Sequence, residues 1–285
     1  MEYVQLLLAV VLLAVDFAFV KLYQIRQGQG MRASLQYSAV QGLLCALVLF
    51  GINGFRLSAT PFSLGMAFLS GALAMAYKLI GFRILAGAQM SLYTFFLLTG
   101  GMTVPFLWGV VFLGETISVL RVAGLLIIAA AIFLSGAGGA KANGRLLGLC
   151  LAVFVLNGFV SVVAKEHQIS AQTVGSGDFA VWTNLCSGLL GVALLPLAKK
   201  KAAAPSFSPR LLPILLGSAV ASGASYLLQL IGAKTRHCAL SHHHGRERDL
   251  YRAGGVRGLS RTPFQKAASG HCAMLCGHVF VFIKS

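Results

Sequence analysis

The chain has 285 residues, of which 57% are hydrophobic and only 11% are charged, and its formal net charge at pH 7 is +16. A soluble domain usually carries about a quarter charged residues, so this composition excludes an ordinary soluble protein and indicates a chain embedded in a lipid bilayer. Most basic residues before residue 236 lie between apolar segments, as on the cytoplasmic face of a membrane. We therefore expect the lipid bilayer as a partner, and no nucleic acid.

Eight apolar segments follow one another, each of about the length that crosses a bilayer as a helix. Five contain no Asp, Glu, Lys or Arg, and the other three hold Asp16, Lys78 and Arg121. Helices buried in a soluble protein would show polar faces at helical spacing, and the segment 90–112 has none. The sequence thus predicts an all-α polytopic membrane protein with helices over residues 3–20, 35–52, 62–80, 90–112, 119–137, 146–164, 179–197 and 211–231.

The loops differ in charge on the two sides of the predicted membrane. One set holds eleven basic residues and the alternate set holds four. The positive-inside rule places the richer set in the cytoplasm and the N-terminus outside, in a multi-pass protein of the cell membrane. The richer set is Lys21, Arg26, Arg32, Lys78, Arg83, Lys141, Arg145, Lys199, Lys200, Lys201 and Arg210, and the poorer set is Arg56, Arg121, Lys165 and Lys234.

Four short patterns recur in the same order in the two halves of the chain. The first and sixth segments end in Lys-x-x-Gln-Ile, at 21–25 and 165–169. The second and seventh carry Gly-Leu-Leu, at 42–44 and 188–190. The third and eighth carry Ser-Gly-Ala followed by Leu-Ile-Gly. Five helices per unit is an odd number, so the second unit enters the membrane from the opposite side, as in the inverted repeats of many secondary transporters.

The segment from Pro105 to Glu115, PFLWGVVFLGE, is followed by Arg121-Val-Ala-Gly124 and an apolar run to Gly136. With these motifs, residues 3 to about 235 resemble the EamA type of the drug/metabolite transporter superfamily. The resemblance implies ten helices in two inverted five-helix units, and alternating access for small metabolites or drugs around a central cavity. It makes residues 3–137 the first repeat and 145–235 the second, truncated after its third helix. The family usually keeps both termini in the cytoplasm, which disagrees with the loop count.

The apolar pattern stops at Arg236, and residues 236–285 hold eight Lys or Arg, six of the seven His and three of the six Cys. Reading the codons from Leu240 onward one nucleotide later permits Tyr-Pro-Ile-Ile-Thr-Gly-Gly. It also permits a Glu, a Gln or Arg six places later and a Gly nine places later, the spacing of Glu115, Arg121 and Gly124. We interpret this tail as the product of a frameshift near residues 235–236 that replaces the last two helices.

A metal site is the alternative interpretation of the tail. Its histidines and cysteines are ligands of the right kinds, but their spacing fits no familiar zinc pattern. A chain translated in the wrong frame produces such clusters by accident, so we predict no metal. The residues concerned are Cys238, His242, His243, His244, His271, Cys272, Cys276 and His278.

Three ionisable residues in or beside the spans are candidates for a role in transport, because charge inside a bilayer is costly. Asp16 either binds a proton, which would then be the coupling ion, or a cationic substrate, or it pairs with Lys21 or water at the interface. Lys78 either contacts an anion in the cavity or extends to the interface. Glu115 suits the turn before the helix 119–137, near the positive end of that helix. With Pro105, Gly114 and Gly124 it forms the predicted structural motif.

Neutral polar residues supply the remaining candidates for the cavity wall. Proline inside a membrane helix frees a carbonyl, which is tolerated where the helix lines a cavity. Each of these residues has an alternative role in helix–helix contact, and Trp108 also suits the aromatic belt at the interface. The candidates are Thr94, Thr99, Thr103, Trp108, Asn157, Asn184, Tyr226 and Gln229.

A membrane enzyme is the rival class of function. The chain before the tail holds only five acidic residues, scattered over different segments, and a single histidine, His167. Enzymes usually cluster carboxylates, metal ligands or a nucleophile with its base. We therefore expect no enzyme and no cofactor, but a secondary transporter of a small solute, most simply an exporter, or an inactive frameshifted product of such a gene.

Overall fold

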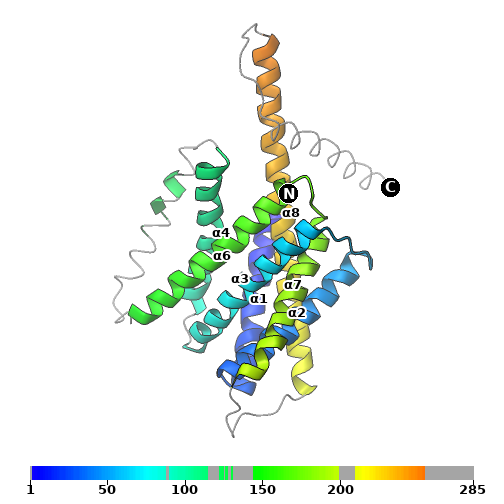
Figure 1. Cartoon of the computed structure of the whole chain (residues 1–285). Helices are drawn as coiled ribbons and strands as arrows, with labels where there is room; N and C mark the ends of the chain where they lie inside the picture. The colour runs from blue at the N-terminus through cyan, green and yellow to red at the C-terminus, as the bar shows by residue number, and fades with distance from the viewer. Residues whose placement is uncertain are drawn as a thin grey trace.

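The computed structural model describes residues 2–87, 90–114, 144–198 and 209–253, with a few residues between 122 and 130, and it describes side chains as far as Gly232. Every element in these ranges is helical (Figure 1). Two 3-10 turns, η1 (Leu195–Leu197) and η2 (Pro209–Leu211), lie between the last two helices. The helices are α1 (Glu2–Gln27), α2 (Met31–Ile52), α3 (Pro61–Ala86), α4 (Met90–Phe112), α6 (Gly144–Ile169), α7 (Ser176–Leu194) and α8 (Leu212–Ala253).

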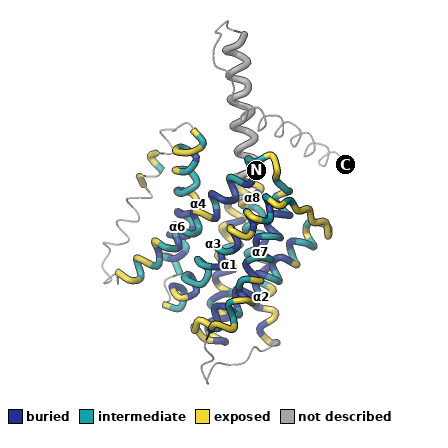
Figure 2. The backbone as a smooth tube through the Cα atoms, in the orientation of Figure 1, coloured by how far each residue is buried: buried dark blue, intermediate teal, exposed yellow. Residues whose placement is uncertain are grey.

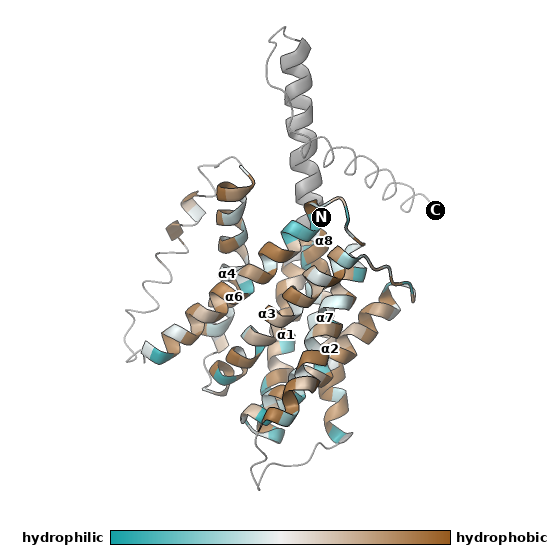
Figure 3. Cartoon of the chain, in the orientation of Figure 1, coloured by the Kyte–Doolittle hydropathy of each residue, from teal (hydrophilic) through white to brown (hydrophobic). Residues whose placement is uncertain are grey.

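Seven helices of the described chain are long and apolar enough to cross a membrane, so the chain has the character of a multi-pass membrane protein. The fifth predicted segment, 119–137, lies mostly outside the described residues. Exposed residues recur along the helices in Figure 2, and most residues of the same helices are hydrophobic in Figure 3. Val11 is 52% exposed and Leu47 is 62% exposed, for example, which suits contact with lipid tails rather than with water.

Local signals explain where these helices begin and end. Thr60 caps α3, because its side chain accepts a hydrogen bond from the backbone N–H of Ser63 at 3.1 Å, and Pro61 begins the first turn. At the end of α1, Gly28 adopts a φ of 91°, which glycine reaches without strain, and its N–H bonds the carbonyl of Gln24 at 2.9 Å. The loop from α1 to α2 is therefore only three residues long.

The helices pack in pairs taken from the two halves of the chain. α2 packs along α7, α1 along α8, and α3 against both α6 and α7, while α4 packs along α6. Glycines allow the backbones to approach where α2 crosses α7: a Cβ on Gly42 would lie 2.9 Å from the Cα of Gly188. A Cβ on Gly100 of α4 would likewise overlap the carbonyl oxygen of Phe154 in α6.

Contacts between the helices fix their directions and define two faces of the bundle. α1, α3 and α7 run toward the face that holds the loop Gly28–Gly30, which we call the basic face. α2, α4, α6 and α8 run toward the opposite face. On the opposite face, the side-chain amide of Asn53 donates to Asp178 at 2.5 Å, and the indole N–H of Trp182 donates to the carbonyl of Ser58 at 3.0 Å. These bonds tie the loop after α2 to the start of α7.

Helix α8 continues beyond the predicted change of pattern at residues 235–236. Its apolar span ends at Gly232, but its backbone stays helical to Ala253 and projects from the bundle (Figure 1). The predicted boundary at 235 thus does not coincide with the end of a helix. Residues 254–285, which include four of the eight candidate metal ligands of the tail, lie outside the described residues.

Candidate functional site

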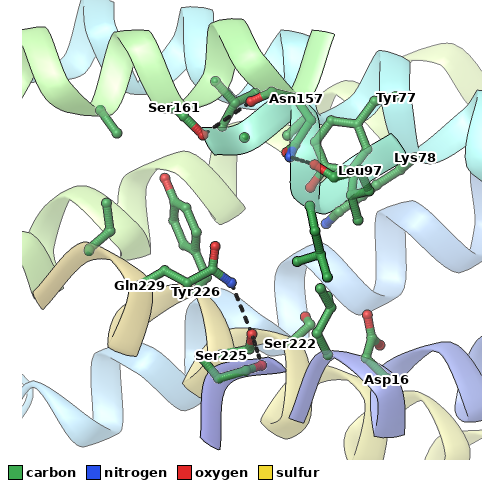
Figure 4. Close-up of a pocket in the computed structure, with 18 of the residues that line it drawn as sticks. Asp16, Tyr77, Lys78, Leu97, Asn157, Ser161, Ser222, Ser225, Tyr226 and Gln229 are labelled. Carbon is green, nitrogen blue, oxygen red and sulfur yellow. Dashed lines mark hydrogen bonds between the residues drawn. The ribbon is translucent and has the colours of Figure 1, made fainter. Parts of the chain in front are cut away.

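A cavity of about 640 Å³ lies inside the bundle, bounded by α1, α2 and α8 on one side and by α3, α4, α6 and α7 on the other. Its walls combine aliphatic and aromatic side chains with a set of polar ones, several of which face the central space in Figure 4. The volume lies in the range typical of small-molecule sites. The polar lining residues are Asp16, Tyr37, Gln41, Tyr77, Lys78, Tyr93, Thr103, Asn157, Ser161, Lys165, Gln168, Thr183, Asn184, Ser187, Ser222, Ser225, Tyr226 and Gln229.

Asp16 is buried, only 8% exposed, and is held by two hydroxyl groups from other helices. The hydroxyl of Ser218 in α8 donates to its Oδ1, and Tyr37 of α2 donates to the same oxygen at 3.3 Å. Ser218 and Tyr37 also contact each other. A buried carboxylate needs such donors, so this arrangement corrects the alternative in which Asp16 pairs with Lys21 at the interface. Lys21 donates instead to the carbonyl of Leu85 at 2.8 Å.

Lys78 lies one helical turn away from the Asp16 group, in a second polar layer. Its Nζ donates to Oε1 of Gln41 at 3.0 Å, and Nε2 of Gln41 donates to Oγ of Ser222 at 2.5 Å. Gln41 follows Tyr37 by four residues on α2, and Ser222 follows Ser218 by four on α8. Lys78 therefore faces the cavity and does not extend to the interface. It should not be counted among the basic residues of the loops.

Lys165 also lines the cavity, although the loop count assigned it to a surface. It is 8% exposed, and its Nζ donates to the carbonyl of Pro105 in the middle of α4 at 3.2 Å. Removing Lys78 and Lys165 leaves ten basic residues in the richer set of loops and three in the poorer set. The asymmetry that underlies the orientation is therefore kept. The cavity wall itself holds two lysines and one aspartate.

Several buried hydroxyls in the cavity wall form no hydrogen bond of normal geometry with the described residues. They belong to Thr103 of α4, Thr183 and Ser187 of α7, and Tyr226 of α8, and the hydroxyl of Tyr226 lies close to that of Thr183. Buried polar groups are usually satisfied, by protein, water or a ligand. In a space of this size these hydroxyls are positioned to bind water or the polar groups of a solute.

The structure places seven of the ten predicted cavity residues in the wall. Two of them donate to main-chain carbonyls: Nδ2 of Asn157 donates to the carbonyl of Leu97 at 2.8 Å, and Nδ2 of Asn184 to that of Ala180 at 2.9 Å. The seven residues are Asp16, Lys78, Thr103, Asn157, Asn184, Tyr226 and Gln229.

The other three predicted residues lie away from the cavity, which corrects that part of the prediction. The hydroxyl of Thr94 donates to the carbonyl of Met90 at 2.8 Å, and that of Thr99 to Phe95 at 2.7 Å, so both satisfy themselves on their own helix. Trp108 donates its indole N–H to Oε1 of Glu166 at 2.6 Å, a tie between α4 and α6.

The residues of the predicted motif near the end of α4 have different positions. Pro105 lies inside α4 and lines the cavity, as does Gly124. Gly114 follows the end of α4 with a φ of 63°, a conformation that favours glycine. Glu115 lies outside the described residues, so its predicted place in the turn stays a prediction.

Four members of the two polar layers were missed from the sequence. Tyr37 and Gln41 are spaced by four residues, and so are Ser218 and Ser222, which together with Ser225 form a stripe on one face of α8. This helical spacing of polar residues in apolar segments was the available signal. Serine and tyrosine are common in membrane helices, however, and the partners Asp16 and Lys78 are far away in the sequence.

No cluster of three or more potential metal ligands occurs among the described residues. Neither a family model nor a curated protein matches the chain. The cavity and its polar wall are therefore the features of the chain that bear on its function.

Proposed function

We propose that the chain is a secondary-active transporter that moves a small organic metabolite or drug across the cell membrane by alternating access. The observation that carries this proposal is the cavity of about 640 Å³ with Asp16 and Lys78 in its wall, inside a bundle of membrane-length helices. Ionisable residues are rare in membrane helices and mark solute or ion pathways. Asp16 is then the candidate for binding a coupling proton.

The proposal includes an inverted repeat, and the packing of the helices is compatible with it. If α1, α2 and α3 correspond to α6, α7 and α8, the pair α1–α8 corresponds to α6–α3, and the pair α2–α8 to α7–α3. The pair α2–α7 corresponds to itself. Each of these pairs packs closely in the bundle. Gly42 and Gly188, which start the recurring Gly-Leu-Leu, meet where α2 and α7 cross, as expected of equivalent residues on a twofold axis.

The directions of the helices agree with this correspondence. A Cβ on Gly191, three residues after Gly188, would lie 2.9 Å from the Cα of Ala39, three residues before Gly42, so α2 and α7 are antiparallel. α1 and α6 also run in opposite directions. Equivalent helices of opposite direction are the mark of an inverted repeat, the design that many secondary transporters use. This correspondence and the motif at 105–115 are the grounds on which we propose membership of the EamA type.

The second interpretation is that the chain is the inactive product of a frameshifted gene. A difference between the surroundings of α1 and α6 favours it. α4 covers α6, but no described helix covers the equivalent face of α1 in the same way. Leu7 on that helix is 66% exposed and Val11 is 52% exposed. On this view the tail replaces the two helices that would complete the second unit, and the cavity stays open on one side.

The two candidates are separated by expressing the chain as it stands and a version whose reading frame is restored after Thr235. Both are matched for amount in the membrane and reconstituted in liposomes. Exchange of labelled amino acids, nucleosides and cationic dyes is then measured, with Asp16→Ala in each form as the control. Exchange by the restored form alone would support the inactive product. Equal, Asp16-dependent exchange by both would support the chain itself as a transporter, and no exchange by either would contradict both.

A further inference from the structure

Two glutamines with equivalent hydrogen bonds lie near opposite ends of the cavity. Gln24 near the end of α1 donates its Nε2 to the main-chain carbonyl of Phe82 in α3 at 2.7 Å. Gln168 near the end of α6 donates its Nε2 to the main-chain carbonyl of Leu230 in α8 at 3.0 Å. Both glutamines occupy the fourth position of the recurring Lys-x-x-Gln-Ile pattern.

These bonds join helices that otherwise barely touch. α1 packs along α8, and α3 along α6, but the contact of α1 with α3, like that of α6 with α8, is confined to a short stretch. Phe82 and Leu85 line the cavity near the basic face, while Gln168 and Leu230 line it near the opposite face. The two short contacts therefore bound the cavity at its two ends.

In each glutamine the amide nitrogen of the side chain has a hydrogen-bond partner, but the amide oxygen has none among the described residues. The Oε1 atoms of Gln24 and Gln168 are both buried, and neither has a hydrogen-bond partner among the described residues. A buried acceptor without a partner is unfavourable, and it regains a hydrogen bond when water reaches it. At each end of the cavity, the Nε2 atom of the glutamine holds two helices together, whereas its Oε1 atom would gain a hydrogen bond if water entered between them. The same side-chain amide thus favours both the closed and the open arrangement.

We propose that Gln24 and Gln168 are the closing residues of the two ends of the cavity, Gln24 at the basic face and Gln168 at the opposite face. This inference rests on the proposed transport function and adds to it the residues that open and close. Breaking either bond separates two helices of the same unit, and water enters from that face only. The basic end is held more firmly, because Lys21 adds a second bond from α1 to the carbonyl of Leu85.

The test measures access to the cavity from each face. Ser161 of α6 lines the cavity and is replaced by cysteine in the full chain. A membrane-impermeant maleimide is applied to intact cells and to inverted vesicles, and the labelling of the parent chain without this cysteine is subtracted. The variants are Gln168→Leu, Gln24→Leu and Lys21→Met/Gln24→Leu. The matched control is Gln229→Leu, because Gln229 lines the same cavity but bonds Ser225 on its own helix.

We expect Gln168→Leu to raise labelling from the opposite face roughly fivefold, the factor expected for one hydrogen bond, with no change from the basic face. Gln24→Leu should raise labelling from the basic face only, and the double variant should raise it further. An equal rise from both faces, no rise, or the same effect from Gln229→Leu would overturn the proposal. If the leucine variants do not accumulate, Gln168→Asn and Gln24→Asn test the same bonds, with the outcomes read in the same way.

Labelling does not require transport. The experiment can therefore contradict the closing roles of Gln24 and Gln168 without contradicting the proposed transport function. Exchange of a solute without one-sided labelling would overturn the roles of Gln24 and Gln168 and leave the transporter proposal standing. Absence of exchange, together with labelling from neither face in any variant, would overturn both.

Discussion

Asp16 of α1 and Lys78 of α3 face one cavity through polar groups that lie a single helical turn apart. Asp16 is bonded by Tyr37 of α2, and Lys78 bonds Gln41, four residues further along the same helix. Helix α8 repeats this spacing with the serines that complete the two layers. Two side chains of opposite charge are thus fixed in neighbouring layers of the cavity wall. Each of them is held by its own hydrogen-bond partners, and the two do not bond each other directly.

The crossing of α2 and α7 should tolerate no added side chain at Gly42. A Cβ there would meet the Cα and N of Gly188 at 2.9 Å, so Gly42→Ala must push two backbones apart. We expect a loss of about 1–3 kcal/mol, as for overpacking of a well-packed core. The measurement is the thermal unfolding of the purified protein in detergent.

The control for this substitution is Gly51→Ala on the same helix. A Cβ on Gly51 would meet no heavy atom within 4 Å, and alanine favours the helix. Its melting temperature should be unchanged or slightly higher. An equal loss from the two alanines would mean that the crossing is not close-packed.

The sequence predicts the spans well, because 20 apolar residues in a row leave the chain few alternatives to a membrane helix. Its recurring patterns also identify Gly42 and Gly188, which meet in the structure. It predicts the cavity only in part. Thr94 and Thr99 look like lining residues by type, but their hydroxyls bond their own helix. Which side of a helix faces the cavity depends on the rotation of the helix about its axis. The sequence does not reveal this rotation where apolar residues occur on all sides of the helix. Ser218 depends on a contact with Asp16, some 200 residues away.

Sidedness is tested by single cysteines at Gly30 and Ser58, which are exposed on the two faces of the bundle. Gly30 is preferable to Gly28, whose φ of 91° would strain a cysteine. The charge asymmetry predicts that an impermeant maleimide applied to intact cells labels Ser58→Cys and not Gly30→Cys. Background from the native cysteines is measured on the parent chain. Labelling of Gly30→Cys alone would reverse the orientation and place the N-terminus in the cytoplasm.

The hydroxyls of Ser187 and Thr183 should matter more to a bound solute than to the fold. Because each is buried without a normal hydrogen bond, Ser187→Ala and Thr183→Val should leave the melting temperature unchanged or raise it. Solute exchange by the same proteins should fall. Thr99→Val is the control, since its hydroxyl bonds its own helix outside the cavity, and its exchange should be normal. Normal exchange in all three variants would exclude contact between these hydroxyls and the solute.

The frameshift is tested by the nucleotide sequence across codons 230–285. Restoring the frame should give two further apolar segments, the first with Thr-Gly-Gly and a Glu after it. The reason is that the codons required by the tail permit these residues one nucleotide later. The same histidine-rich tail, encoded in the same frame at a related locus, would contradict the frameshift and point to a selected tail.

Asp16 and Lys78 should be coupled, because their opposite charges act on each other across the shared cavity. Removing one charge leaves the other buried without its counter-charge, which is destabilising, whereas removing both is often far less harmful. We therefore expect Asp16→Asn and Lys78→Met each to lower the melting temperature. The double variant should lose less than the sum of the two single losses. Solute exchange should be lost in all three variants if both charges contact the solute.

A double-mutant cycle on the melting data measures this coupling, and Tyr37→Phe with Lys78→Met serves as the comparison cycle. Tyr37 bonds Asp16 but carries no charge, so its cycle reports the loss of hydrogen bonding alone. Strictly additive losses for Asp16→Asn and Lys78→Met would show that the two charges are separately solvated by the cavity. In that case each acts on a solute independently, and the layers around Tyr37 and Gln41 would serve only to hold the two side chains in place.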